Sequence, residues 1–422
     1  MQLGFWVLIA MLGTFLVANM LFKLPVSISM VLGAIVGAVV GGKGFPLRHL
    51  FEGSFVYLDT MLIILTATLF MRVIEKSGAM DALGATIVHR FHKAPATLLI
   101  LVMLIIMFPG MITGSSAAAV LSVGAIVAQI FQLIGIPDNK SGAILAIGAI
   151  LGMAAPPVSI PAMLIAGGVD MPYIGFAVPL LCMTIPCAIF TVLFLGYRHC
   201  KGMDYEKIHD KLDLETAQKY GIRLYAPIGI VLVLMALTRA FPSVIPNLGM
   251  PLIFVIGTVC GVFVGKRFDF LETARQSIAD TVPVCAKLVG VGMFIQILTL
   301  TGARGTIVVG CLGLGVVLLY VCCVTVLPVF GAISSFGASS VFGVPFLLAM
   351  LSGNQIVTAS ALALLASMGD LMPPTALAGN YAAQIVKQKY SDVFRACLVP
   401  AAVCLAVGLL FLIFSKNLGF LV

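Results

Sequence analysis

Two apolar segments interrupted by proline carry the groups with which this chain could bind an ion and a small solute. Residues 152–168 read GMAAPPVSIPAMLIAGG, and residues 369–380 read GDLMPPTALAGN. Proline lacks an amide proton and clashes with the preceding helical turn, so carbonyl groups near each break lose their helical partners. Inside a bilayer, such groups persist only where they are buried in protein or line a cavity. The pattern is typical of the paired broken helices of transporters.

Two further polar interruptions lie inside long apolar stretches. PGMITGSS at 109–116 divides residues 94–134, and GAISSFGASS at 331–340 divides residues 306–352. A flexible polar tip suits a re-entrant hairpin, and a pair of full spans is the alternative for the first stretch. We expect the two tips and the two breaks to converge near the middle of the membrane.

The converging tips and breaks would supply two kinds of ligand. Hydroxyl and amide groups suit an organic carboxylate, and the candidates for substrate binding are Thr113, Ser115, Ser116, Ser159, Ser339, Ser340, Thr375 and Asn380. Freed carbonyl, hydroxyl and carboxylate oxygens suit sodium, and the candidates for cation binding are Gly110, Gly114, Gly152, Ala154, Pro156, Ser334, Gly337, Gly369, Asp370 and Pro373. The alternative for each hydroxyl is a hydrogen bond to its own helix.

Charged residues inside apolar segments are the sharpest individual candidates. A carboxylate at a helix centre in a membrane costs about 2.5–3.5 kcal/mol unless it is paired or binds a ligand, so Asp370 is predicted to bind sodium or a proton. Capping of the break is its alternative role. Lys287 would pair with Asp280, extend to the membrane surface or meet an anionic substrate. Asp59 and Asp280 begin corresponding spans and are expected to cap helices.

Composition places the chain among all-α polytopic membrane proteins. It has 422 residues, of which 61% are hydrophobic and 9% are charged. The formal charge of +8 is scattered over short loops, which argues against a nucleic-acid surface. The ten cysteines show no metal-ligand spacing, and the five histidines fall in loops or interfacial segments. We therefore expect no metal site, no cofactor other than sodium as a coupling ion, and no enzymatic activity.

The order of these features repeats about 217–221 residues later, which indicates an internal duplication. The first repeat, 1–200, is predicted to contain scaffold helices at 1–42, an interfacial arm at 43–56 and a transport part at 57–197. A cytoplasmic linker at 201–222 follows. The second repeat, 223–422, would contain scaffold helices at 223–265, an interfacial arm at 266–281 and a transport part at 282–422.

The distribution of lysine and arginine predicts the orientation. With the polar loop at 198–223 on the cytoplasmic side, most basic residues fall on that side, in agreement with the positive-inside rule. The first hairpin then opens inward and the second outward, so the repeats have inverted topology. We expect a multi-pass protein of the inner (plasma) membrane.

Over nearly its whole length the chain resembles the large membrane (permease) subunit of the tripartite ATP-independent periplasmic (TRAP) transporters, within the ion-transporter superfamily. The resemblance rests on LFEG at 50–53, ITGSSAAAV at 112–120, APPVSIPA at 155–162 and MPPTALAG at 372–379. It implies sodium-driven symport of a small organic anion, such as a dicarboxylate, by an elevator motion. It also implies two partners, a four-helix small membrane subunit and a periplasmic substrate-binding protein.

Three hypotheses follow for the function. The first is sodium-coupled uptake of a small organic acid by an elevator-type carrier. The second is a stand-alone carrier that works without a binding protein, as a homodimer or with proton coupling. The third is an intramembrane hydrolase with a serine of ITGSSA as nucleophile, against which the lack of a membrane-embedded histidine argues. The identity of the substrate does not follow from these residues.

Overall fold

The computed structural model describes residues 2–200, 215–241, 246 and 248–422, and in these ranges the chain forms helices joined by turns, with no strand. Within the same ranges, nine helices are long and apolar enough to cross a membrane. The predicted class, an all-α polytopic membrane protein, is confirmed. Residues 201–214 of the predicted linker lie outside the described residues.

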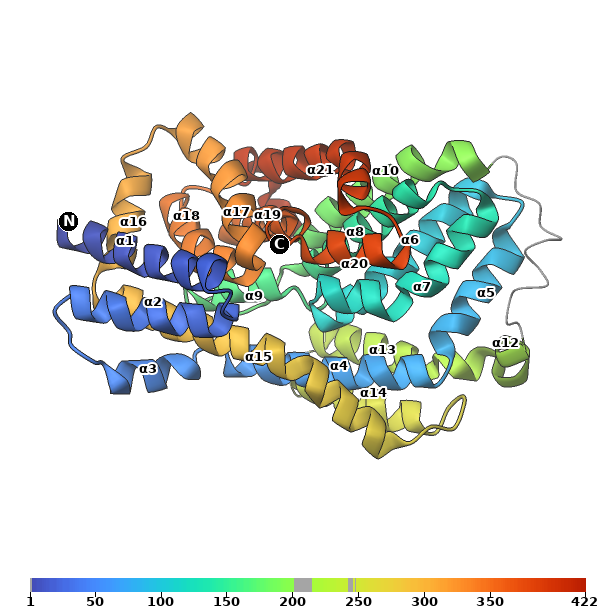
Figure 1. Cartoon of the computed structure of the whole chain (residues 1–422). Coiled ribbons are helices and arrows are strands. Elements are labelled where there is room, and N and C mark those ends of the chain that lie inside the picture. Colours follow the sequence, from blue (N-terminus) through green and yellow to red (C-terminus); the bar gives the residue numbers. More distant parts are fainter. Residues whose placement is uncertain (1, 201–214, 242–245, 247) are drawn as a thin grey trace.

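One group of helices in each half forms a wall along one side of the molecule (Figure 1). In the first half these helices are α1 (Gln2–Leu16, extended by a π-helical turn at Val17–Leu21), α2 (Val26–Val40), α3 (Leu47–Ser54) and α4 (Leu58–Lys76). In the second half they are α12 (Glu215–Tyr220), α13 (Ala226–Ala240, preceded by a 3-10 turn at Gly221–Tyr225), α14 (Gly249–Val262) and α15 (Phe270–Leu300).

The two halves exchange helices within this wall. α15 of the second half packs mainly on α2 and α3 of the first, while α4 of the first half packs mainly on α14 of the second. Glycines permit the close approach, because a Cβ added at Gly290 of α15 would lie 2.6 Å from the carbonyl oxygen of Ser27 in α2. The sequence grouped residues of α4 and α15 with the hairpins, but their main contacts are with the first two helices of each half.

The predicted interfacial arm at 266–281 differs from its expected form. It was expected to be separate from the transport part that begins at 282, but residues 270–300 form one helix of 31 residues, α15. The side chain of Asp269 caps this helix by accepting hydrogen bonds from the amides of Leu271 and Glu272. Charged residues indicate that a helix is exposed to solvent, but they do not end it. Pro283 also lies within α15 without ending the helix.

The expected capping roles of Asp59 and Asp280 are wrong. Asp280 lies in the interior of α15, and Asp59 lies in the first turn of α4, whose N-cap residue is Tyr57, without a side-chain cap.

The remaining helices form a core of two hairpins and two broken helices. In the first half, α5 (Ala79–Phe91) leads to the hairpin of α6 (Pro95–Thr113) and α7 (Ser116–Ile134), the broken helix of α8 (Asp138–Ala154) and α9 (Ile160–Gly167), and α10 (Ala177–Cys200). In the second half, α16 (Ala303–Leu312) leads to α17 (Val316–Ala338), a π-helical turn at Ser339–Gly343 and α18 (Val344–Ala349). The second broken helix comprises α19 (Gln355–Ser367), a 3-10 turn at Met368–Leu371 and α20 (Leu377–Ile385), and α21 (Tyr390–Ile413) and a 3-10 turn at Asn417–Leu421 follow.

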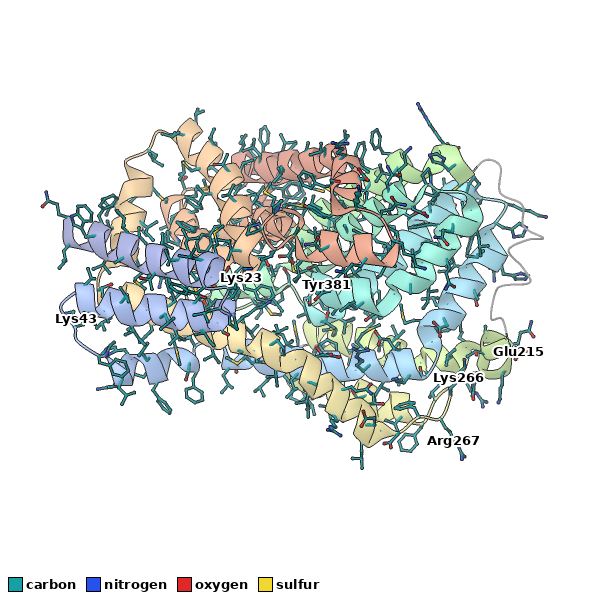
Figure 2. All side chains as sticks on the ribbon, viewed as in Figure 1. Lys23, Lys43, Glu215, Lys266, Arg267 and Tyr381 are labelled. Atoms are coloured by element: carbon teal, nitrogen blue, oxygen red, sulfur yellow. The ribbon has the colours of Figure 1, made fainter. Side chains whose placement is uncertain are left out.

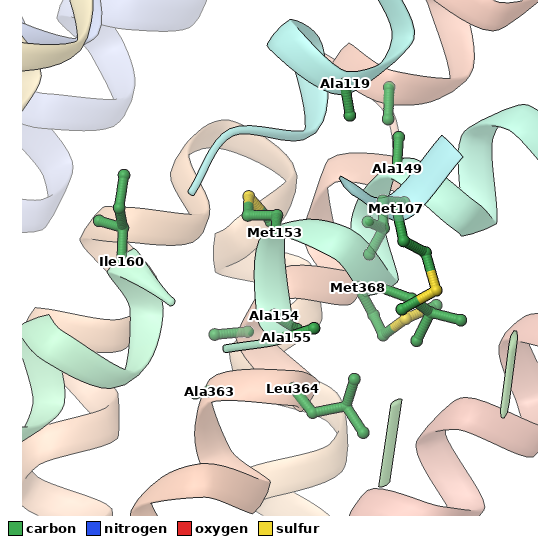
Figure 3. Packing of buried hydrophobic residues seen from close by; sticks show 14 of the residues in the cluster. Met107, Ala119, Ala149, Met153, Ala154, Ala155, Ile160, Ala363, Leu364 and Met368 are labelled. Carbon is green, nitrogen blue, oxygen red and sulfur yellow. The ribbon is translucent and has the colours of Figure 1, made fainter. Parts of the chain in front are cut away.

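Contacts between equivalent elements reveal a pseudo-two-fold relation between the halves. α8 packs on α20 as α19 packs on α9, and α10 contacts its own counterpart α21. The thiols of Cys187 and Cys404, which lie 217 residues apart, interact with each other across that contact. Figure 3 shows the end of α8, at Ala154 and Ala155, close to Ala363 and Leu364 of α19. Only elements beside a two-fold axis can touch their own equivalents in this way.

The two hairpins point toward each other. In Figure 1, α6 and α7 run inward from one end of the molecule and α17 and α18 from the opposite end. This arrangement agrees with the predicted inversion of the repeats and brings both tips to the middle of the chain.

Candidate functional site

A cavity of about 380 Å³ lies between the wall and the core. α4 and α15 form one side of it, and the two hairpin tips and the second broken helix form the other. Figure 2 shows Tyr381, one of its lining residues, near the middle of the molecule, whereas Glu215, Lys266 and Arg267 lie at its edge. Both hairpin tips reach the cavity, as predicted.

The polar centre of the cavity is Asp370, which is only 6% exposed. Ser116 Oγ of the first hairpin donates a hydrogen bond to Asp370 Oδ2, and Ser335 of the second hairpin interacts with the same carboxylate. These serines lie 219 residues apart and are equivalent in the two repeats. The position equivalent to Asp370 in the first repeat is Met153, which also lines the cavity. One carboxylate therefore sits between two symmetry-related hydroxyl groups.

A second pair of serines fixes the hairpin tips. Ser115 has an extended backbone and its Oγ accepts a hydrogen bond from the amide of Ala118, so it caps α7. Ser334 interrupts α17 with an extended backbone, and its Oγ accepts a hydrogen bond from the amide of Gly337 at 3.1 Å. Each serine therefore caps the N-terminus of the second helix of its hairpin. Each cap thereby holds the next residue, Ser116 or Ser335, against Asp370.

Equivalent backbone hydrogen bonds tie each tip to its broken helix. The amide of Val158 donates to the carbonyl oxygen of Met111 at 3.0 Å, and 217 residues later the amide of Thr375 donates to that of Ala332 at 3.3 Å. The hydroxyl of Thr375 donates to the Ala332 oxygen as well, at 2.5 Å. The unwound backbone of both breaks is thus partly satisfied by the hairpins, as burial in a membrane requires.

Glycine pairs allow the hairpins to cross the broken helices at backbone contact. A Cβ added at Gly110 would lie 2.9 Å from the carbonyl carbon of Gly152. In the second repeat, a Cβ added at Gly331 would lie 2.7 Å from the carbonyl oxygen of Ala366 and 3.1 Å from the Cα of Gly369. The same crossing occurs in both repeats, so each tip has a fixed position over its break.

Half of the predicted substrate ligands line the cavity, namely Thr113, Ser115, Ser116 and Thr375. The lining residues do not include Ser159, Ser339, Ser340 and Asn380. Ser339 donates to the carbonyl of Ser335 in its own helix, Ser340 accepts from the hydroxyl of Tyr57, and Asn380 donates to the carbonyl of Thr375. Ser159 is fully buried, and its Oγ has no hydrogen-bond partner among the described residues.

Two of the predicted cation ligands, Ser334 and Asp370, line the cavity. The lining residues do not include the others, namely Gly110, Gly114, Gly152, Ala154, Pro156, Gly337, Gly369 and Pro373. Three of their carbonyl oxygens already accept amide hydrogen bonds, since Gly110 accepts from Gly114, Gly152 from Ala155 and Gly369 from Met372. A carbonyl oxygen has two lone pairs, so each retains one acceptor site. The part of the chain that the structure describes holds no cluster of His, Cys, Asp and Glu suited to a metal ion.

The opposite wall of the cavity carries a charged cluster that the sequence did not indicate as a site. Arg72 of α4 donates from Nε and Nη2 to Asp280 Oδ2 of α15 at 2.9 and 2.5 Å, and its Nη1 lies 3.1 Å from Glu75 Oε2. The spacing of Arg72 and Glu75 by three residues was the only local signal, because helical neighbours at that spacing share a face.

Lys287 also lines the cavity and acts electrostatically on Asp370. Among the described residues it forms no ion pair within 4 Å, and Asp280, its predicted partner, is engaged by Arg72. Asp280 and Lys287 lie seven residues apart in α15, or about 10 Å along the helix, so the two charged groups occupy different levels of the cavity.

We expect Ser116→Ala to be coupled energetically to Asp370. A hydrogen bond to a charged group contributes about 1.5–3 kcal/mol, so a double-mutant cycle with Asp370→Asn should give a coupling energy of about 1–3 kcal/mol. Denaturant unfolding in detergent measures it. Thr191→Val is the matched control, because its buried hydroxyl donates only to the carbonyl of Cys187 in its own helix. Additive effects of Ser116→Ala and Asp370→Asn would contradict the assigned contact.

Comparisons with known proteins agree with this architecture. The family model described as "Tripartite ATP-independent periplasmic transporter, DctM component" matches residues 12–418. Among solved structures, the chain is similar to the YdaH transporter of Alcanivorax borkumensis, with 15% identity over 87% of this chain and 88% of that one and a TM-score of 0.58. It is also similar to Neisseria gonorrhoeae MtrF, described within a class of antimetabolite efflux pumps, with 16% identity over 88% and 84% of the two chains and a TM-score of 0.60. At these identities the structures show a shared fold alone. A comparison with curated proteins gave no match.

Proposed function

Because this chain belongs to the DctM component family of the tripartite ATP-independent periplasmic transporters, we propose that it takes up a small organic anion together with sodium. It is a multi-pass membrane transporter, and its family is one of transporters and not of enzymes. The coupling ion, the substrate class and the motion are proposals, which the following observations support.

The observation that carries the proposal is the charge of the cavity. Three acidic groups, Glu75, Asp280 and Asp370, face two basic groups, Arg72 and Lys287, so the cavity has one excess negative charge when all are ionised. An anion would be repelled by this excess unless a cation entered with it. Binding of an organic anion and binding of a cation are thus coupled by electrostatics. Sodium fits the oxygen ligands around Asp370, and each net positive charge moved inward gains about 2.3 kcal/mol per 100 mV.

The division between wall and core supports an elevator motion. Asp370 and both serine tips belong to the core, whereas Arg72 and Lys287 belong to the wall. We assign α4 and α15 to the stationary scaffold, in place of boundaries at 57 and 282, because they pack mainly on α14 and α2. Movement of the core along this wall would carry the carboxylate and its bound cation from one side of the membrane to the other.

The family membership also supports partners and a location. We propose that the chain works in the inner membrane with a small membrane subunit of four helices and a periplasmic substrate-binding protein. The competing arrangement is a carrier that works alone or as a homodimer. Transport by the purified chain alone, compared with transport after the other two components are added, separates these arrangements.

Uptake of labelled succinate into proteoliposomes tests the function. We expect uptake that requires an inward sodium gradient and disappears when potassium replaces sodium outside. A thermal-shift screen of small organic acids, with and without sodium chloride, identifies a better substrate if succinate binds poorly. Uptake that ignores every cation gradient would contradict the proposed coupling.

A further inference from the structure

Glu75 is a buried acidic group in the cavity that sodium binding at Asp370 does not use. It lies in the last turn of α4, and its side chain is 15% exposed. The carboxylate interacts with Ser122 of α7, the second helix of the first hairpin. Its Oε2 meets Arg72, whereas Oε1 is fully buried and has no hydrogen-bond partner among the described residues. An ionised carboxylate oxygen without a partner is costly to bury.

The charges around Glu75 do not balance. Among the described residues, Arg72 is the only cation in direct contact with Glu75. It is shared with Asp280, because two of its nitrogens donate to Asp280 Oδ2. A cluster of two carboxylates and one guanidinium carries one negative charge. Of the other helices that pack on α4, 95–113 and 249–262 contain no charged or histidine residue. The cations of α15, Arg275 and Lys287, do not act on Glu75. In α5, which also contacts α4, the titratable residues are Asp81, His89 and Arg90, and none of them acts on Glu75.

We propose that Glu75 is a proton-binding site and that the proton moves with the substrate as a second coupling ion. A proton on Oε1 makes the cluster neutral and turns the unpartnered acceptor into a donor. The hydroxyl of Ser122 hydrogen-bonds to the ionised carboxylate, and its oxygen has lone pairs that can accept from the protonated form. The proton binds to Glu75 and not to Asp280, because the Asp280 side chain is 45% exposed and accepts two hydrogen bonds from Arg72.

This site is distinct from the one at Asp370. Glu75 belongs to the wall and Asp370 to the core, and the nearest charged neighbours of the two groups are Arg72 and Lys287 respectively. Ser122 lies on α7, the hairpin helix that begins at Ser116, so its hydrogen bond to an ionised Glu75 joins the wall to the core. Protonation removes the charge that strengthens this bond and would loosen the contact. Proton binding would thereby favour one position of the core, which is what coupling requires.

Infrared difference spectroscopy of the purified chain in lipid nanodiscs tests the proposal without any substrate. Between about pH 8 and about pH 6, a range above that in which exposed carboxylates protonate, we expect the carbonyl stretch of a protonated carboxyl group to appear, and Glu75→Gln should remove one component of it. Asp370→Asn should leave that component in place. Glu52→Gln is the matched control, because Glu52 is an exposed glutamate that pairs with Arg48 on α3, and its spectrum should equal that of the unmodified protein.

Two further variants test the physical cause. Asp280→Asn removes the like charge that competes for Arg72, so protonation of Glu75 should need a proton concentration at least about tenfold higher. Ser122→Ala removes a hydrogen bond that favours the ionised carboxylate, so it should act in the opposite direction and let Glu75 protonate at a lower proton concentration. Alanine is well tolerated in a helix. Glu75→Gln with a spectrum identical to the unmodified protein would overturn the proposal, as would an Asp280→Asn variant with unchanged proton uptake. A Glu75 signal that responds to sodium chloride and not to pH would also overturn it.

The inference of coupled movement rests on the proposed transport function, and uptake measurements separate the two. With succinate as the probe, an inward proton gradient should accelerate sodium-driven uptake by the unmodified protein, and Glu75→Gln should lose this acceleration. Loss of the infrared component alone, without any uptake by the unmodified protein, would contradict the transport proposal and leave the proton site standing.

Discussion

Asp370→Asn should abolish sodium-dependent uptake while leaving the fold intact. Two unit charges about 4 Å apart interact by about 4 kcal/mol at an effective dielectric constant of 20, so removing the carboxylate charge should weaken sodium binding by at least about 100-fold. The asparagine oxygen still accepts the hydrogen bond of Ser116. A buried charge is lost as well, so the variant should be at least as stable as the unmodified protein in sodium-free buffer.

The measurement compares thermal unfolding over a sodium titration with uptake of labelled succinate under a sodium gradient. Asp59→Asn is the control, because Asp59 is an exposed carboxylate in the first turn of α4 and lies outside the cavity. We expect this control to keep both the sodium-dependent stabilisation and the uptake. An Asp370→Asn variant that is still stabilised by sodium over the same concentration range would show that the coupling cation binds elsewhere.

The sequence predicted the repeats and the two hairpins because those features are encoded locally. Polar, glycine-rich tips inside apolar segments and paired prolines at a constant offset leave few structures that satisfy the backbone in a membrane. It did not predict which hydroxyl meets Asp370. Ser115 and Ser116 are adjacent, yet one caps a helix and the other meets Asp370, and this difference depends on the extended backbone at Ser115.

The charged wall could not be predicted, because its contacts are not local. Arg72 and Asp280 are separated by 208 residues and meet only after α4 and α15 have packed against each other. The same applies to the length of α15, since the charged residues that suggested an interfacial segment continue into the membrane helix without a break. Local polarity identified the hairpin tips that reach the cavity, and tertiary packing determined which groups lie opposite them.

The glycine crossings lead to the second large expected effect, on stability. At Gly152 an added Cβ would overlap the backbone of Met107, and at Gly369 it would overlap the backbone of Gly331 and lie 2.7 Å from the amide nitrogen of Ala332. Backbone atoms cannot rotate away as a side chain can, so hairpin and broken helix must separate. Such overpacking costs about 1–3 kcal/mol or more. Gly152→Ala and Gly369→Ala should each lower the free energy of unfolding by at least this amount.

Separation of the hairpin from the break should also disturb the site, because Gly369 adjoins Asp370 and its partner Gly331 lies in the tip that carries Ser335. We therefore expect Gly369→Ala to lose sodium-dependent stabilisation, whereas Gly152→Ala, in the repeat without a carboxylate, should retain more of it. Thiol-reactive fluorescence during thermal unfolding reports both properties. Gly13→Ala and Gly229→Ala are matched controls, since a Cβ at either helical position meets no atom within 4 Å, and alanine should stabilise these helices by about 0.8–1.0 kcal/mol. Equal stability of Gly369→Ala and Gly229→Ala would mean that the hairpin does not cross the break at backbone contact.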